Sequence, residues 1–232
     1  MQKLGIHISP LALYDKTKVL LADKESGHGG CSAQSPTGDS GSCRRRIIME
    51  NTNVKTETKT EQSSIQFLTI TAIFVALTYV FTAFINVRLP IAANGGLIHL
   101  GNVPLFIGAI IFGKKTGMIA GGVGMGLFDL LSGWTAWAPF TLIIVGLMGY
   151  AVGKITESEK HQKFGWYVVA IAVACVIKVV GYYIAEIFLY GNFVAPMASV
   201  PGNLVQIGVA AVIVLLVVGR LNVAAKRMGL KK

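Results

Sequence analysis

The sequence predicts an all-α membrane protein with six transmembrane helices and both termini in the cytoplasm. The first observation is composition: 53% of the 232 residues are hydrophobic and 14% are charged. A typical soluble domain carries about 25% charged residues. The second is that apolar runs of about 20 residues, the length a membrane helix needs, recur from residue 65 onward. The third is the distribution of lysine and arginine between these runs, which sets their orientation.

Residues 1–64 are polar and poor in aromatic residues, as is typical of a disordered cytoplasmic tail. They hold nine Lys/Arg and seven Asp/Glu, whereas residues 65–232 hold twelve and four. No apolar core of the signal-peptide kind lies near Met1. The stretch RRRIIM, Arg44 to Met49, leaves two alternatives open. Either it is a translated ribosome-binding site, so that Met49 is the true start and residues 1–48 are not native, or it is a basic cluster of a real tail.

The membrane domain is expected over residues 65–225, followed by a basic cytoplasmic tail over residues 226–232. Several of the expected helices are short, and the third is rich in glycine, which lets membrane helices approach closely. We expect these glycines to serve packing within the chain. The expected helices are Ile65–Ile85, Ile98–Phe112 (gaining length if it starts near Gly95-Gly96), Thr116–Leu131, Pro139–Ile155, Phe164–Tyr190 and Gly202–Leu221.

The connections between these helices alternate in charge. One set holds Lys114 and Lys115, then Lys154, Lys160 and Lys163, and ends in the basic C-terminus. The other set, over residues 86–97, 132–138 and 191–201, holds a single cation, Arg88. By the positive-inside rule the first set is cytoplasmic, so both termini are cytoplasmic and the second set faces outward.

Motifs for an enzyme, a metal or a nucleic-acid partner were not found. The sequence has no Gly-x-Ser-x-Gly elbow, no His-Glu-x-x-His and no Walker motif. The three cysteines, Cys31, Cys43 and Cys175, have no zinc-site or disulfide spacing. Aromatic residues lie in apolar runs rather than in basic patches. We therefore expect a transport or structural protein without a cofactor.

Polar residues inside membrane helices are costly and usually face a cavity or a partner. Lys178, Tyr182 and Glu186 are spaced i, i+4, i+8 and share one helix face. Further polar and aromatic residues are expected at the same outer depth as Glu186. Together they predict an outward-facing pocket for a small polar ring compound, lined by His99, Asn102, Trp134, Trp137, Lys178, Tyr182, Glu186, Asn203 and Gln206.

Each of these residues also has a structural interpretation. Trp134 and Trp137 suit an interfacial aromatic belt. Lys178 and Glu186 could pair with each other or with other helices. Asp129, at the end of the third helix, could cap the following loop. His99, Tyr182, Asn203 and Gln206 could cap or pack helices.

The stretch GGLIHLGNVPLFIGAIIFGKKTGMIAGGVGMGLFDLLSGWTAWAPFTLIIVGLMGY, Gly95 to Tyr150, carries a resemblance to a known family. It resembles the substrate-binding S component of an energy-coupling factor (ECF) vitamin transporter. The matching features are the Gly-Gly mouth, the glycine-rich third helix, the Asp-Leu-Leu-Ser-Gly end and the aromatic loop into Ala-Pro. The resemblance covers about residues 65–225. Where the family often has Asp, this chain has Asn102, which carries no charge.

The resemblance implies a multi-pass protein of the cell membrane with a vitamin site near its outer face. It implies that Ala72 and Ala76 pack on a coupling membrane subunit, that two separate subunits hydrolyse ATP, and that the S component topples to carry the vitamin inward. The substrate favoured is hydroxymethylpyrimidine, followed by a pyridoxine-type vitamin and then riboflavin. A stand-alone channel or structural membrane protein is the alternative of a different class.

Overall fold

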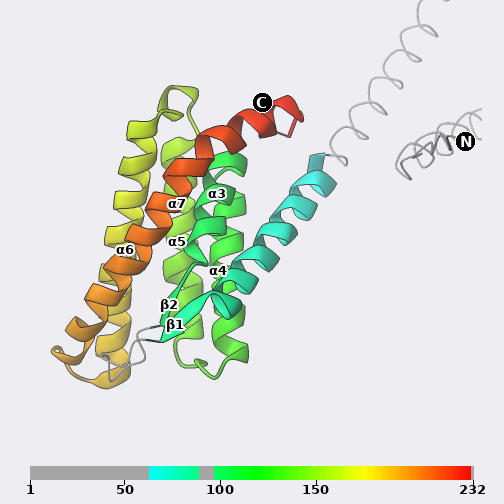
Figure 1. Cartoon of the computed structure of the whole chain (residues 1–232). Helices are drawn as coiled ribbons and strands as arrows, with labels where there is room; N and C mark the ends of the chain where they lie inside the picture. The colour runs from blue at the N-terminus through cyan, green and yellow to red at the C-terminus, as the bar shows by residue number, and fades with distance from the viewer. Residues whose placement is uncertain (1–62, 89–96, 231–232) are drawn as a thin grey trace, which may run out of the picture. The chain divides into compact units, whose positions relative to one another are not determined.

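The computed structural model describes residues 63–88 and 97–230, and this part of the chain is mostly helical (Figure 1). Two short 3-10 turns, η2 (Glu159–His161) and η3 (Ala195–Ser199), lie in the connections between the last three helices. The helices are Ser63–Phe84, here called the first helix, α3 (Asn102–Phe112), α4 (Lys114–Leu131), α5 (Ala138–Thr156), α6 (Phe164–Tyr190) and α7 (Val200–Arg227).

Four helical segments are long and apolar enough to cross a membrane: the first helix, α5, α6 and the continuous stretch Ala195–Arg227. Large apolar side chains project from their outer surfaces; Phe188 of α6 is 76% exposed and Leu216 of α7 is 74% exposed. Such a surface is stable in lipid and not in water. The prediction of a helical multi-pass membrane protein is therefore confirmed, while six spans and cytoplasmic termini stay predictions. Of the predicted tail over residues 1–64, residues 1–62 lie outside the described residues, and Ser63 and Ser64 begin the first helix.

The core is built around the short helix α3. Leu105 and Phe106 of α3 are fully buried, and they belong to one apolar cluster with Val145 of α5, Ala174 of α6 and Val214 of α7. In Figure 1, α6 lies on one side of this core and the first helix lies on the other, while α7 crosses the bundle diagonally from the lower end of α6 to the C-terminus. Two short strands, β1 (Asn86–Arg88) and β2 (Leu97–His99), and the α4–α5 and α6–α7 connections lie at one end of the bundle. The α5–α6 connection and the last described residues lie at the opposite end.

The start of the second predicted helix differs from the prediction. Strand β1 (Asn86–Arg88) pairs antiparallel with β2 (Leu97–His99), with Asn86 opposite His99. The helix α3 begins only at Asn102, so the predicted helix from Ile98 and the placement of His99 on it are wrong. Strand pairing supplies hydrogen bonds for the backbone of residues 97–99 that a helix would otherwise provide. Gly95 and Gly96 lie outside the described residues.

The glycines of α4 pack within the chain, as expected. A Cβ added at Gly117 would lie 2.8 Å from the carbonyl oxygen of Gly149, and one at Gly122 would lie 2.8 Å from the carbonyl oxygen of Leu142. Both distances are shorter than real Cβ contacts, so α4 and α5 meet backbone to backbone. A single residue, Gly113 with φ of 92°, turns the chain from α3 into α4. This close packing holds α5 directly against α4.

Candidate functional site

The three polar residues of α6 lie on one helix face, as their spacing predicts. Lys178 is 2% exposed and Glu186 is 5% exposed, although both are ionisable side chains in an apolar helix. Tyr182 lies between them and is half-buried. Groups of this kind are rarely buried without partners. The following contacts show where each one is held.

Lys178 is joined to α7 and to the hairpin through Gln206. Its ammonium donates a hydrogen bond to Oε1 of Gln206, and Nε2 of Gln206 donates to the backbone oxygen of His99 at 3.1 Å. Gln206 is 2% exposed. We call these three residues the Lys178 relay. It connects α6 and α7 with β2, which is far from both helices in the sequence, at the end of the bundle where the β strands lie.

The partner of the Lys178 ammonium is neutral. Within residues 63–88 and 97–230, the ion pair found is Lys114–Glu157, and it does not involve Lys178. An ammonium has three N–H donors, of which the hydrogen bond to Gln206 uses one. The Nζ atom also lies 5.7 Å from the centre of the Tyr182 ring, within the range of a cation–π contact. The amine therefore keeps donor capacity for an acceptor that the described residues do not supply.

Tyr182 and Glu186 have partners on two further elements. The hydroxyl of Tyr182 lies 2.9 Å from that of Thr141 in the first turns of α5. Ser199, at the end of η3, donates to Oε2 of Glu186 at 2.7 Å. The structural alternative in which Lys178 pairs with Glu186 is therefore not observed. Instead, Glu186 ties the α6–α7 connection back onto α6.

The aromatic residues of the α4–α5 connection meet the end of α6. The rings of Trp134 and Trp137 are edge to face, with centres 5.2 Å apart. The ring of Trp137 also lies 6.0 Å from that of Tyr190. Trp134 and Trp137 are each partly buried, so part of each side chain packs against the protein. They bring an aromatic surface to the same end of the bundle as Glu186.

Asn102 and Asn203 are the two amides of the predicted pocket without partners. Asn102, the first residue of α3, is fully buried, and neither atom of its amide group has a hydrogen-bond partner in the described part of the chain. A buried unpaired amide is rare and costs about 1–3 kcal/mol. Asn203 is half-buried on α7 and makes no hydrogen bond to another described residue. Both amides are free to bond a ligand or water.

Sequence reasoning missed Thr141, Ser199 and Tyr190. Thr141 is 2% exposed and bonds Tyr182. A signal for it was present, because Thr141 is the single hydroxyl near the outer end of the apolar run that forms α5. Ser199 lies in a connection whose fold the sequence does not indicate, so its contact with Glu186 had no local signal.

Ala72 and Ala76 lie on a different surface, along the first helix. Both are exposed. The opposite face of that helix is buried through Thr71, Thr78 and Thr82, and Thr71 lies 3.3 Å from the hydroxyl of Thr116 on α4. The exposed face therefore carries two small residues beside large apolar ones such as Leu68, which is 68% exposed.

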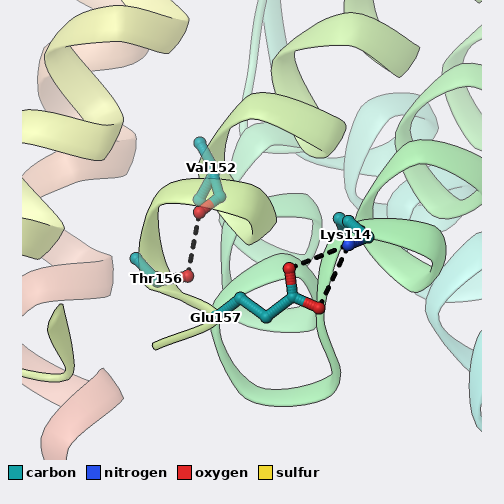
Figure 2. Close-up of polar contacts among 4 residues, drawn as sticks. All are labelled: Lys114, Val152, Thr156 and Glu157. Carbon is teal, nitrogen blue, oxygen red and sulfur yellow. Dashed lines mark hydrogen bonds and ion pairs between the residues drawn. The ribbon is translucent and has the colours of Figure 1, made fainter. Parts of the chain in front are cut away.

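An ion pair closes the opposite end of the bundle, where α4 begins and α5 ends. Figure 2 shows Lys114, whose Nζ lies 3.1 and 2.9 Å from the two carboxylate oxygens of Glu157. Nearby, Thr156 donates to the backbone oxygen of Val152 at 2.8 Å. The hydrogen bond from Lys114 lowers the pKa of Glu157 below its ordinary value, and the same bond raises the pKa of Lys114. The pair is exposed and far along the helices from the Lys178 relay.

This arrangement defines a helical multi-pass membrane protein with a buried polar cluster at one end of the bundle. Residues 62–223 match the family described as ECF-type riboflavin transporter, S component, and the chain belongs to that family. The S-component resemblance seen in the sequence is thereby confirmed. The family is one of transporter subunits rather than enzymes.

Two relatives give further comparison. The chain is 29% identical over 166 residues to the thiamine precursor transporter HmpT of Lactococcus lactis subsp. cremoris (strain MG1363), covering 72% of this chain and 87% of that protein. It is 34% identical over 105 residues to an uncharacterized protein in gap 3'region of Pyrococcus woesei, covering 45% of this chain and 69% of that protein.

Proposed function

We propose that this S component binds hydroxymethylpyrimidine, the thiamine precursor, and delivers it to an ATP-driven importer in the cell membrane. The Lys178 relay is the observation that carries this proposal, because it places a buried cation with unused donors among aromatic rings and amides. The relative named as a thiamine precursor transporter supports this substrate. Pyridoxine-type vitamins and riboflavin are the alternative substrates, and the family description names riboflavin.

The chemistry of the cluster suits a small substituted ring. A pyrimidine offers ring nitrogens as acceptors, an amino group as a donor and a hydroxymethyl group as either. In the proposed complex, Lys178 donates to a ring or hydroxyl acceptor, and Glu186 accepts from the amino group in place of Ser199. Asn102 and Asn203 gain the partners that they lack. Trp137 supplies an apolar surface for the ring.

Calorimetry on detergent-purified protein tests the substrate. Hydroxymethylpyrimidine, pyridoxine and riboflavin are titrated separately, and mass spectrometry identifies any ligand that is released from the protein as purified. We expect the tightest binding for hydroxymethylpyrimidine. Tighter binding of riboflavin or pyridoxine would replace the substrate but keep the site, whereas no binding of any of the three would overturn the proposal.

We further propose that Ala72 and Ala76 form the contact with the coupling membrane subunit, whose complex includes two ATPase subunits. The exposed position of both alanines supports this role. Small residues let two membrane helices approach closely, so leucine at both positions should block the contact. Transport should fall while vitamin binding to the isolated protein persists.

Co-purification distinguishes this proposal from a stand-alone membrane protein. The wild-type chain should bring down one membrane subunit and two ATPases, and the Ala72→Leu/Ala76→Leu variant should lose them. As a matched control, Ala136→Leu, in the α4–α5 connection, should retain all three. Loss of vitamin binding together with the partners would show instead that the alanines are needed for the fold.

A further inference from the structure

A cleft lies at the end of the bundle opposite the Lys178 relay. It has a volume of about 290 Å³ and is bounded by the first helix, the end of α3, the start of α4 and the last described residues of the chain. Its wall combines apolar side chains with polar groups from Ser63, Gln66 and Thr116 in about equal measure. The residues that carry the argument are Phe67, Ile70, Ile111, Phe112, Thr116 and Leu230.

The cleft opens between helices whose outer surfaces are apolar. Phe67 is 37% exposed, and the neighbouring Leu68 is 68% exposed. On a membrane protein such surfaces meet acyl chains. The cleft therefore has lipid rather than water as its neighbour along the first helix, and an acyl chain is the molecule that reaches it without crossing a polar surface.

Cations lie beside the cleft in the sequence. Lys115 directly precedes Thr116, and Lys226 and Arg227 form the last turn of α7, just before Leu230. All three cations are exposed, and none of them forms an ion pair with a carboxylate in the part of the chain that the structure describes. Lys114 differs, since it is paired with Glu157. Basic pockets between membrane helices are typical binding places for anionic lipid headgroups.

We propose that this cleft binds an anionic phospholipid, with one acyl chain against Phe67, Ile70 and Ile111 and the phosphate on Lys115 and Arg227. The acyl chain of such a lipid matches the apolar side chains of the cleft, and its phosphate matches the unpaired cations that neighbour the cleft in the sequence. A vitamin would use only the cleft, and a soluble anion would use only the cations. The site is distinct from the proposed vitamin site, which lies at the other end of the bundle.

Native mass spectrometry of the full-length purified protein tests the site. Phosphatidylglycerol and phosphatidylcholine with identical acyl chains are titrated in parallel, and the fraction of protein retaining one lipid gives relative affinity. We expect phosphatidylglycerol to bind more tightly. One cation near a lipid phosphate contributes about 1 kcal/mol, which is about fivefold in affinity. Lys115→Gln and Arg227→Gln should each lose about that factor for phosphatidylglycerol and little for phosphatidylcholine.

Two further variants separate the cleft from general surface charge. Lys160→Gln removes a cation from the α5–α6 connection, at the same end of the bundle but outside the cleft, and should leave binding unchanged. Ile70→Trp fills the cleft and should weaken both lipids. Its fold is checked by thermal unfolding and by vitamin binding, which should persist.

Three outcomes would overturn the proposal. Equal loss in Lys160→Gln and Lys115→Gln would mean that the lipid responds only to surface charge. Equal affinity for the two lipids would mean that the headgroup is not recognised. Full phosphatidylglycerol binding in a folded Ile70→Trp variant would mean that the acyl chain lies elsewhere. Failure of vitamin binding in the wild type would bear on the proposed substrate and not on this site.

Discussion

Replacing Lys178 with methionine separates a binding role from a structural one. Methionine keeps the length and apolar stem of the side chain and removes the ammonium. The variant therefore loses the hydrogen bond to Gln206 and the contact with the Tyr182 ring, while the packing of the core changes little. If Lys178 binds the substrate, affinity depends on the ammonium itself.

The expected loss of affinity follows from the hydrogen bond that Lys178 can give to a ligand. A hydrogen bond involving a charged group contributes about 1.5–3 kcal/mol. Each 1.4 kcal/mol is about a factor of ten, so binding should weaken by about one to two orders of magnitude. Protein stability should behave differently. A buried ammonium without a directly paired carboxylate is costly to desolvate. Its removal offsets the cost of about 1–3 kcal/mol for leaving Oε1 of Gln206 unpaired.

The assay combines calorimetry with thermal unfolding on the same preparations. Lys178→Met should bind the vitamin weakly and unfold at a temperature close to that of the wild type. Lys178→Met/Gln206→Leu, which also removes the hydrogen bond to the backbone oxygen of His99, should bind no better than the single variant. Lys163→Met, which alters an exposed lysine at the other end of α6, serves as the control and should change neither property. Unchanged affinity together with a large fall in unfolding temperature would refute the reasoning and make the relay a structural element.

Three other predictions follow from the remaining contacts. Ser199→Ala should release the α6–α7 connection from its carboxylate partner on α6, so that amide exchange over residues 191–199 rises by about tenfold or more; unchanged exchange would show that the connection is held elsewhere. Ala136→Cys should react with an impermeant thiol reagent from outside, and Lys160→Cys should not, in a background without the native cysteines; the reverse pattern would invert the topology. The lowered pKa of Glu157 means that its pairing stabilises the fold above its ordinary pKa of 4.5 and is lost as pH falls through the lowered value, while the raised pKa of Lys114 preserves the pair to its ordinary 10.5 and beyond. The difference in unfolding temperature between wild type and Glu157→Gln should therefore be constant between these two ordinary pKa values, from about pH 5 to about pH 10. A difference that vanishes near neutral pH would contradict the assignment.

The long helices were predictable because their signals are local. The predicted bounds of α6, Phe164–Tyr190, agree with the structure at both ends. Its apolar run is continuous, and Gly191 ends it in the left-handed conformation with φ of 62°. The bounds of α5 differ from the prediction by a single residue at each end. The last helix extends beyond the prediction to Arg227, because charged residues end an apolar run without ending a helix.

The β hairpin was not predictable in the same way. A three-residue strand such as Leu97–His99 is too short to show an alternation of apolar and polar residues. Its partner strand, Asn86–Arg88, is not adjacent to it in the sequence, so no local pattern indicates the pairing. The helical pattern of the following residues therefore extended too far toward the N-terminus. The consequence reaches the site: His99 contributes its backbone oxygen to Gln206, and its ring nitrogen Nδ1 accepts from the backbone N–H of Gly101 at 3.3 Å.

For the candidate site, spacing indicated the shared face of Lys178, Tyr182 and Glu186, but it did not indicate their partners. A helix of period 3.6 fixes which residues of α6 point the same way. It says nothing about which helix they meet. The partners are Gln206, Thr141 and Ser199, which come from three different elements and lie 28, 41 and 13 residues along the chain from the residues they bond. Only the packing of α5, α6 and α7 brings them together.

The neutral partner of Lys178 bears on how binding and selection work in the proposed function. A carboxylate in place of Gln206 would compensate the ammonium and leave little for a ligand to gain. With Gln206, the charge keeps unused donors, and the fully buried amide of Asn102 has no hydrogen-bond partner among residues 63–88 and 97–230. A ligand with acceptors at the right spacing gives these unpaired groups hydrogen-bond partners when it binds. An apolar ring of the same shape gives them none. Selection should thus fall on the pattern of ring nitrogens and hydroxyls more than on ring size. Analogues of hydroxymethylpyrimidine that replace one ring nitrogen with C–H should bind more weakly, even though they fill the same space.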